Sequence, residues 1–436
     1  MKQDIFLDYN IPIGIFCIFV IIPFLKQREN FNPKYTCRYI KNKKTMKEAF
    51  IIAAKRTAIG GFMGSLSSFT APHLGAKIIQ STYESVTVLP ENIDSVYMGN
   101  VLSAGVGQSP ARQAAIFSHI PVDKDATTIN KVCASGMKAA MIGAQQIQLG
   151  LENLVMTGGM ESMSNVPHYN YLRHGKKLGD SQLTDGLITD GLWDVYHNFH
   201  MGSAAELGVK KYGLTRQQLD DFALLSYKRA QKAAEGNKFT AELIGISVEG
   251  KKGTTIIERD EDIDKLIPEK ISLLKPAFEK DGLLTAANSS NLNDGAAAIL
   301  IGSSEAVEKY NLQPLARIVA YADAAQSPEW FTTSPSIAIQ KILKRTGLSL
   351  SDIDYFEINE AYSSVILSNQ QILGYDLDKV NVYGGAVALG HPIGASGARI
   401  ITTLVNVLRQ EGGRYGIAAI CNGGGGASAI LIENLN

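Results

Sequence analysis

The chain has 436 residues, 45% of them hydrophobic, and carries 42 basic and 42 acidic side chains. This length exceeds one ordinary hydrophobic core and predicts two or three packed units. Zero net charge and the lack of a basic, aromatic-studded stripe argue against nucleic-acid binding. The four cysteines are Cys17, Cys37, Cys133 and Cys421. They form no C-x-x-C pair, so neither a disulfide framework nor a structural zinc site is expected.

The first 45 residues differ from the rest of the chain. Ile11–Leu25 is an uninterrupted apolar run with two prolines, shorter than the roughly 20 residues of a membrane-spanning helix. Lys26–Lys44 is basic and contains one acidic residue, as in transit peptides. We interpret residues 1–45 as an organelle-targeting leader, with the mitochondrion as the expected destination and another organelle as the alternative. The other open interpretations are a membrane-associating tail, or a true start at Met46 and a cytoplasmic protein.

From Met46 onward, buried strands alternate with helices. The predicted strands are 49–54, 93–101, 125–130, 154–161, 296–301, 353–359, 380–383, 415–420 and 427–432, and segment 314–319 starts a second half of the chain. The predicted helices are 74–86, 110–117, the segment from Cys133 to a stop at Gly150, 215–235, 360–373 and 396–410. This alternation predicts βαβ units and a parallel sheet covered on both faces.

The second half of the chain repeats the pattern of the first. Segments 93–99 and 353–359 are each a strand followed by a helix, and we interpret them as corresponding parts of a duplicated α/β domain. Residues 163–285 break the rhythm and are expected to form an insertion that folds over one face. The predicted domains are therefore 46–312, which includes the insertion, and 313–436.

Cys133 lies where a predicted strand turns into a helix. In the first turn of a helix, free backbone N–H groups and the positive end of the dipole favour an anion. We therefore expect a lowered thiol pKa and a nucleophilic sulfur. The alternative is that Cys133 is a small buried hydrophobic residue, as free cysteines often are.

Three further stretches place polar groups at strand ends or glycine-rich turns. Asn359–Tyr362 closes a buried strand, His391 lies between glycines at a helix start, and Cys421 precedes four glycines. Glycines let backbone N–H groups approach a substrate and stabilise an oxyanion. Alone, such a histidine is more often a helix cap and such a glycine run a plain turn. The specific signal is the conjunction of two cysteines and one histidine, each at a strand-to-loop end and without zinc spacing.

These stretches together resemble the signature blocks of the thiolase family. The blocks are Cys133–Met137, Asn359–Ala361, Gly390–Gly397 and Cys421–Gly425, supported by His200–Gly202 and Asn288–Ala296. The resemblance covers residues 46–436 and is strongest to thiolases of the acetyl-CoA acetyltransferase type. It implies a duplicated α/β core in five layers (αβαβα), with the inserted loop domain binding coenzyme A. It also implies reversible Claisen condensation of two acetyl-CoA to acetoacetyl-CoA and CoA.

The resemblance implies a division of labour among three side chains. Cys133 attacks the acyl thioester and carries the acetyl group, and His391 takes the thiol proton. Cys421 removes a Cα proton from the second acetyl-CoA.

Two oxyanion sites are implied as well. One consists of His200 and a water held by Asn359, and the other of the backbone N–H groups of Cys133 and Gly423.

The resemblance also implies ligand contacts. Ser290 contacts the pantetheine arm of CoA, and the CoA contacts further include Tyr227, Met201 and Ala361. A potassium site, as in thiolases of the mitochondrial type, maps onto Tyr227, Ala286, Ala287, Ser289 and Val387. Ser289 replaces an alanine there, and Tyr362 replaces the usual phenylalanine after Ala361. No organic prosthetic group is expected, the expected assembly is a homotetramer, and membrane contact is expected only through the N-terminal extension.

Other functions stay open at this stage. A 3-ketoacyl-CoA thiolase of fatty-acid β-oxidation would share the motifs, and a thiolase-like lipid-binding protein would lack catalysis. Retention of Cys133, Asn359, His391 and Cys421 together argues against the latter. A decarboxylating ketoacyl synthase would need a second histidine at Cys421, and a cysteine hydrolase would need no second cysteine.

Overall fold

The computed structural model describes residues 46–173, 175–251 and 253–435. The chain divides into Met1–Met46 and Lys47–Asn436, and the description below concerns the second unit. The predicted targeting leader lies outside the described residues. Within the described residues, no helix has the length and apolar character needed to cross a membrane.

The first half of the unit closely follows the predicted elements. Its strands are β1 (Ala49–Thr57), β2 (Gly60–Gly61), β3 (Ser95–Gly99), β4 (Asp125–Ile129), β5 (Leu154–Ser162) and β13 (Asn293–Ser303). Its helices are α3 (Ala71–Glu84), α4 (Pro110–Phe117), α5 (Ser135–Leu149) and α8 (Ser304–Lys309). Proline opens α4, where its missing N–H costs nothing. Gly150 ends α5 with φ of 69°, a left-handed conformation that favours glycine.

The second half departs from the prediction at several places, and its helices at 334–346 and 386–389 were not predicted. Its strands are β14 (Ala316–Ala325), β15 (Tyr355–Ile358), β16 (Tyr415–Asn422) and β17 (Gly426–Asn434). Its helices are α9 (Ser334–Thr346), α10 (Ser363–Leu373), α11 (Ala386–Leu389) and α12 (Ile393–Glu411). The predicted strand 380–383 was wrong, because Val380 forms only one bridge, with Phe356. The helix predicted from Glu360 begins at Ser363, because Asn359 and Glu360 turn inward as buried polar groups.

The two halves share one strand topology. In the first the order is β4-β3-β5-β13-β1, and in the second it is β15-β16-β17-β14. The corresponding pairs β3–β5 and β15–β16 are both parallel. The next pairs in each half, β5–β13 and β16–β17, are both antiparallel. The bridge from Phe356 to Val380 stands where the first half has β4. The predicted duplication is therefore confirmed.

The sheet is mixed, so the prediction of a parallel sheet was wrong. Strands β16 and β17 are joined by the short turn 423–425, and so short a connection makes the pair antiparallel. Between β5 and β13 the chain passes through the long insertion, and β13 returns antiparallel to β5. Only a strand–helix–strand crossover imposes parallel pairing, and β3, β4 and β5 are linked in this way through α4 and α5.

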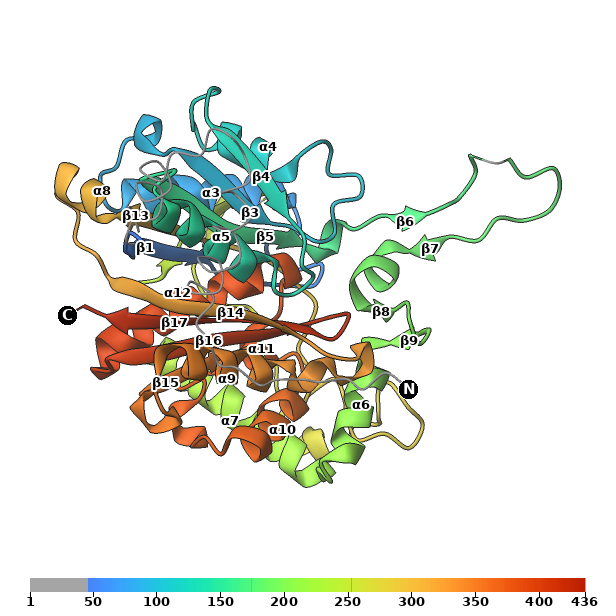
Figure 1. Cartoon of the computed structure of the whole chain (residues 1–436). Coiled ribbons are helices and arrows are strands. Elements are labelled where there is room, and N and C mark those ends of the chain that lie inside the picture. Colours follow the sequence, from blue (N-terminus) through green and yellow to red (C-terminus); the bar gives the residue numbers. More distant parts are fainter. Residues whose placement is uncertain (1–45, 174, 252, 436) are drawn as a thin grey trace, which may run out of the picture. The chain divides into compact units, whose positions relative to one another are not determined.

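Helices cover both faces of each sheet half and give five layers (Figure 1). Helices α5 and α12 lie between the two halves, and one buried apolar cluster joins them to strands of both. Helices α3 and α4 cover the outer face of the first half. Helices α9 and α10, with α6 (Met201–Lys211), cover the outer face of the second. Strands β1 and β14 pair at the junction of the halves.

The insertion 163–285 contains short strands and two helices. Its elements are β6 (His168–Tyr169), β7 (Thr184–Asp185), β8 (Trp193–Asp194), β9 (Phe199–His200), α6, α7 (Arg216–Glu235), β10 (Leu243–Ile244), β11 (Ile246–Gly250) and β12 (Gly253–Ile257). The Thr215 side chain caps α7 in a capping box with Gln218. Helices α6 and α7 lie beside the second half in Figure 1, whereas β6 and β7 extend outward.

Candidate active site

A cavity of about 310 Å³ is lined by four of the residues predicted to carry catalysis, and Asn359 and Cys421 lie behind its wall, beside His391 and Cys133. It is lined by Cys133, Met163, Gly191, Leu192, His200, Met201, Ala277, Phe278, Ala286, Ser289, Ser290, Asn291, Leu292, Phe331, Ala361, Tyr362, His391, Ile393 and Gly423. The duplicated topology explains the meeting of the thiol and the imidazole. Cys133 precedes the N-cap of α5 by one residue, His391 precedes that of α12 by one residue, and these helices pack side by side.

Cys133 lies on a strained turn. Val132 has φ of 48°, a left-handed conformation that is rare for a β-branched residue. The Ser135 hydroxyl holds the turn, because it donates to Val132 O at 2.6 Å and accepts from Lys131 N at 2.8 Å. Such strain persists only when the surroundings fix it, and it often marks a functional residue.

The pKa of the Cys133 thiol differs from the sequence-based expectation. The residue lies before the N-cap rather than in the first helical turn. Burial raises the pKa of the Cys133 thiol to about 12, although the backbone N–H groups of Gly423 and of Cys133 itself lower it. The expected lowered pKa was therefore wrong, because removal from water outweighs the two N–H groups. The resting thiol is protonated and needs a base.

His391 has the tautomer of a base. Its Nδ1 lies 2.6 Å from the Ser396 hydroxyl, which itself donates to Pro392 O at 2.9 Å. Because the hydroxyl proton points at Pro392, we assign the shared hydrogen to Nδ1 and the acceptor lone pair to Nε2. Burial, with a smaller effect of the Arg399 charge, lowers the pKa of His391 to about 3. The imidazole is neutral and can accept the thiol proton.

Asn359 lies beside this base at the end of β15. Its Nδ2 is 3.4 Å from His391 Nε2. Its Oδ1 is buried and has no hydrogen-bond partner within the described part of the chain. An unpaired buried acceptor fits a bound water, as the predicted oxyanion site requires.

His200 lines the same cavity from the insertion. Its Nδ1 accepts a hydrogen bond from Gly202 N at 3.0 Å and caps α6, and its ring stacks on Phe278 with centroids 5.0 Å apart. Burial lowers the pKa of His200. Because Nδ1 accepts, Nε2 carries the hydrogen of the neutral ring and is a donor.

Cys421 is the residue before the last of β16 (Tyr415–Asn422) and is 1% exposed. Burial raises its pKa, and the neighbouring Cys133 thiol raises it further. The turn after Cys421 requires glycine at position 425. Gly425 has φ of 82°, and an added Cβ would lie 2.2 Å from Gln326 O. This turn directs the Gly423 N–H toward the Cys133 sulfur.

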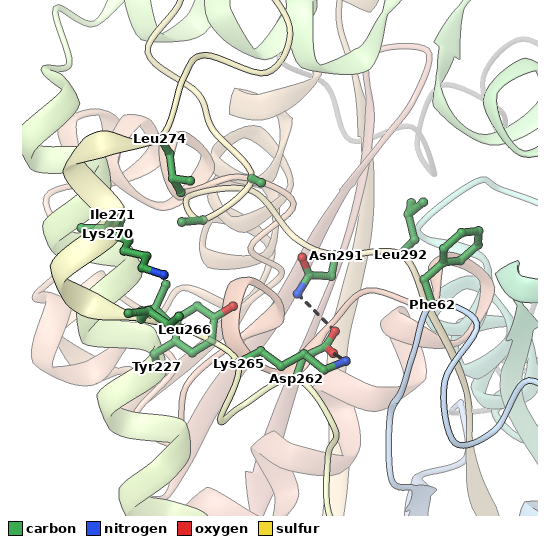
Figure 2. A pocket seen from close by; sticks show the side chains of 13 residues that line it. Phe62, Tyr227, Asp262, Lys265, Leu266, Lys270, Ile271, Leu274, Asn291 and Leu292 are labelled. Atoms are coloured by element: carbon green, nitrogen blue, oxygen red, sulfur yellow. Dashed lines mark hydrogen bonds and ion pairs between the residues drawn. The ribbon is translucent and has the colours of Figure 1, made fainter.

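A second pocket of about 460 Å³ adjoins the cavity and shares Ala286, Asn291 and Leu292 with it (Figure 2). In Figure 2 the Tyr227 ring and the Lys270 side chain point into this pocket. Lys265 lies in its wall and pairs with Asp262 at 2.7 Å. Most of its wall comes from the insertion.

The residues of the predicted potassium site divide between these pockets and the core. Tyr227, Ala287 and Val387 share one buried apolar cluster, and Ala286 lines both pockets. Ser289 lines the catalytic cavity, and its buried hydroxyl has no partner among the described residues. Among those residues no group of three or more His, Cys, Asp or Glu side chains could hold a metal, so a cation here would rely on carbonyl and hydroxyl oxygens. Hard cations prefer such oxygens.

The sequence interpretation missed two supporting residues, Ser396 and Glu161. Ser396 stands inside the glycine-rich block, but only the structure shows that it orients His391. Glu161 is fully buried at the end of β5 and accepts N–H bonds from three backbone groups and Asn100. The available signal was an acidic residue directly after the apolar run 154–160. A carboxyl group buried at the end of a strand needs hydrogen-bond partners, because unpaired buried charges are costly.

Comparison with known proteins defines the class of protein to which this site belongs. The family models for the thiolase N-terminal and C-terminal domains match residues 49–305 and 312–434. The chain belongs to the thiolase family, and it is an α/β protein of the thiolase fold.

Two curated relatives indicate the branch. The chain is 49% identical to a cytosolic acetyl-CoA acetyltransferase of Gibberella zeae, covering 88% of this chain and 98% of the relative. It is 46% identical to the mitochondrial acetyl-CoA acetyltransferase of Bos taurus, covering 94% and 97%.

Two solved structures share the fold. A thiolase from Ascaris suum in complex with coenzyme A has a TM-score of 0.86 at 45% identity, covering 89% of this chain and 100% of that one. Human mitochondrial 3-ketoacyl-CoA thiolase has a TM-score of 0.87 at 39% identity, covering 90% and 100%.

Proposed function

We propose that this chain is an acetyl-CoA C-acetyltransferase that reversibly condenses two acetyl-CoA to acetoacetyl-CoA and CoA. The observation that carries the proposal is that Cys133 and His391 line one cavity, with the imidazole held by Ser396 through Nδ1 so that Nε2 remains an acceptor. The names of the curated relatives support the same activity.

In the first half-reaction Cys133 becomes acetylated. Its sulfur attacks the thioester carbonyl of acetyl-CoA while its proton passes to His391 Nε2. The carbonyl oxygen gains negative charge, which the N–H groups of Cys133 and Gly423 stabilise. The C–S bond to CoA then breaks, and His391 returns the proton to the CoA sulfur.

In the second half-reaction Cys421 generates the carbon nucleophile. Its thiol gives a proton to His391, and the resulting thiolate removes a Cα proton from the second acetyl-CoA. The enolate attacks the acetyl carbon on Cys133 and forms the new C–C bond. The Cys133–acetyl bond breaks, and the imidazolium returns its proton to the Cys133 sulfur. A water on Asn359 and the Nε2–H of His200 would stabilise the enolate oxygen.

The adjoining pocket offers a place for the rest of CoA. The acyl end would lie at Cys133, with Ser290, Met201 and Ala361 along the pantetheine arm. The Lys270 ammonium, with Tyr227, would meet the nucleotide end, whose phosphates attract a cation. CoA is then a substrate and product, and no organic prosthetic group is required.

The longer-chain thiolase reaction is the second candidate, supported by the likeness to human mitochondrial 3-ketoacyl-CoA thiolase. The aromatic residues Phe278, Phe331 and Tyr362 narrow the cavity and favour a short acyl group. Thiolysis by the full chain of acetoacetyl-CoA and of 3-ketohexadecanoyl-CoA separates the two. Preference for acetoacetyl-CoA supports our proposal, and equal or faster turnover of the long substrate refutes it.

A potassium ion at Tyr227, Ala286, Ala287, Ser289 and Val387 is part of the proposal. It would order the loop that carries Ser290 and thereby favour CoA binding. Potassium chloride should raise the thermal midpoint more than equal sodium chloride does, and Ser289→Ala should reduce this difference. Equal midpoints in both salts would argue against the site.

A homotetramer and a mitochondrial location are proposed on family grounds, and relatives include both mitochondrial and cytosolic forms. Light scattering of the full chain tests the first, and a monomer would contradict it. Residues 1–45 fused to a fluorescent protein test the second, and a diffuse cytosolic signal would contradict it.

A further inference from the structure

Tyr362 occupies a special position in the catalytic cavity. Its side chain is 7% exposed and lines the cavity together with Cys133. Its ring meets Phe278 edge-on at 5.8 Å and Phe331 at 6.4 Å. The cavity beside Cys133 is therefore bounded by these three rings, of which only Tyr362 carries a polar atom, together with the imidazoles of His200 and His391.

The Tyr362 hydroxyl is unlike those of the other buried tyrosines. Tyr83 donates to Ser118 O, Tyr375 to Ile366 O and Tyr383 to Glu411, whereas the Tyr227 hydroxyl lies near the Asn291 side chain. Within the described part of the chain, the Tyr362 hydroxyl has no hydrogen-bond partner. Buried polar groups are normally paired, so solvent or a ligand in the cavity must pair this one.

The hydroxyl stays neutral at every physiological pH, because burial raises its pKa. It is therefore a weakly polar group rather than a charge. A short acyl group leaves room for a water at this hydroxyl. A longer acyl chain displaces that water with methylene groups and leaves the hydroxyl unpaired in an apolar environment, which is costly.

We propose that the Tyr362 hydroxyl, which the usual phenylalanine lacks, strengthens the preference for acetyl on Cys133, and so adds to the selection of acetoacetyl-CoA over 3-ketoacyl-CoA substrates with longer chains. The proposal rests on the proposed function. It makes Tyr362 a specificity residue: the ring shapes the pocket, and the oxygen makes extra methylene groups unfavourable.

The test is the Tyr362→Phe enzyme, which keeps the ring and removes one oxygen. Thiolysis by the full chain is measured with acetoacetyl-CoA, which leaves acetyl on Cys133, and with 3-ketohexanoyl-CoA, which leaves butyryl. We expect the kcat/KM for 3-ketohexanoyl-CoA to rise about tenfold or more, so that the ratio of the two kcat/KM values falls accordingly. An unchanged ratio would overturn the proposal.

Tyr375→Phe is the matched control, because Tyr375 belongs to the same buried cluster and its hydroxyl is paired outside the cavity. It should lower the thermal midpoint and leave the ratio unchanged. A similar ratio change in both variants would show a general loosening and refute the role of Tyr362. A wild-type enzyme inactive on acetoacetyl-CoA would refute the proposed function itself, whereas an active wild type with an unchanged Tyr362→Phe ratio refutes only the role of Tyr362.

Discussion

Glu161 Oε2 accepts a hydrogen bond from Gly394 N at 2.9 Å and thereby ties the end of β5 to the start of α12, three residues after His391. The same oxygen accepts from Val101 N, and Oε1 accepts from Leu102 N and from the Asn100 amide. Gly394 needs to be glycine here, because an added Cβ would lie 2.7 Å from Glu161 Oε2. This carboxylate holds the His391 segment in place.

Glu161→Gln should therefore damage both stability and acylation. The amide nitrogen would face two N–H donors on one side, which leaves buried groups unpaired at a cost of about 2–4 kcal/mol. The free energy of unfolding and the rate of Cys133 acetylation both report the change. Glu305→Gln is the control, because Glu305 forms an exposed pair with Lys47, and a loss within about 0.5 kcal/mol is expected. Equal stabilities of the two variants would contradict this role.

Ser396→Ala should slow acylation while leaving CoA affinity nearly unchanged. Without the hydroxyl, His391 Nδ1–H loses its acceptor, and the tautomer with hydrogen on Nε2 becomes populated. We expect the single-turnover acetylation rate to fall about tenfold to a hundredfold. Ser364→Ala is a matched control, since that buried hydroxyl in α10 has no partner among the described residues. A Ser396→Ala enzyme with the wild-type acetylation rate would remove Ser396 from the orienting role.

His391 should make the protein sensitive to acid. Its pKa is about 3 in the folded protein and 6.5 as the reference. Between these values the unfolded chain binds a proton that the folded chain does not, so stability falls as pH falls. From pH 7 to pH 5 this contribution amounts to about 2 kcal/mol. Denaturant unfolding at pH 7 and at pH 5 measures the loss of stability between them. The loss for His391→Asn should be smaller than the loss for the wild type by about 2 kcal/mol. Equal losses would contradict a buried neutral imidazole.

Much of the fold was predictable because its signals are local. The apolar runs of β5 and β13, proline at the start of α4 and glycine after α5 each act within a few residues. Strand direction was not predictable in this way. It depends on the direction in which the chain re-enters the sheet, at β13 after the insertion and at β17 after a short turn. The predicted strand 380–383 did not form, because its pairing within the described residues is a single bridge from Val380 to Phe356.

The active site likewise has a part that the sequence predicted and a part that it did not. The motifs around Cys133, His391 and Cys421 predicted which residues meet in one small region, and the structure brings them there. The thiol pKa was predicted in the wrong direction, because helix position is visible in sequence and burial is not. Ser396 and Glu161 act through contacts with His391 and Gly394 that depend on the packed fold.

The most direct test of the account is mass spectrometry of the full-length Cys421→Ala protein after mixing with acetyl-CoA. We predict one acetyl group on the peptide that contains Cys133, release of CoA, and no acetoacetyl-CoA, because the base for the second half-reaction is missing. Cys133→Ala should acquire no acetyl group. Formation of acetoacetyl-CoA by Cys421→Ala at the wild-type rate, or absence of acetyl from Cys133 in both this variant and the wild type, would contradict the mechanism.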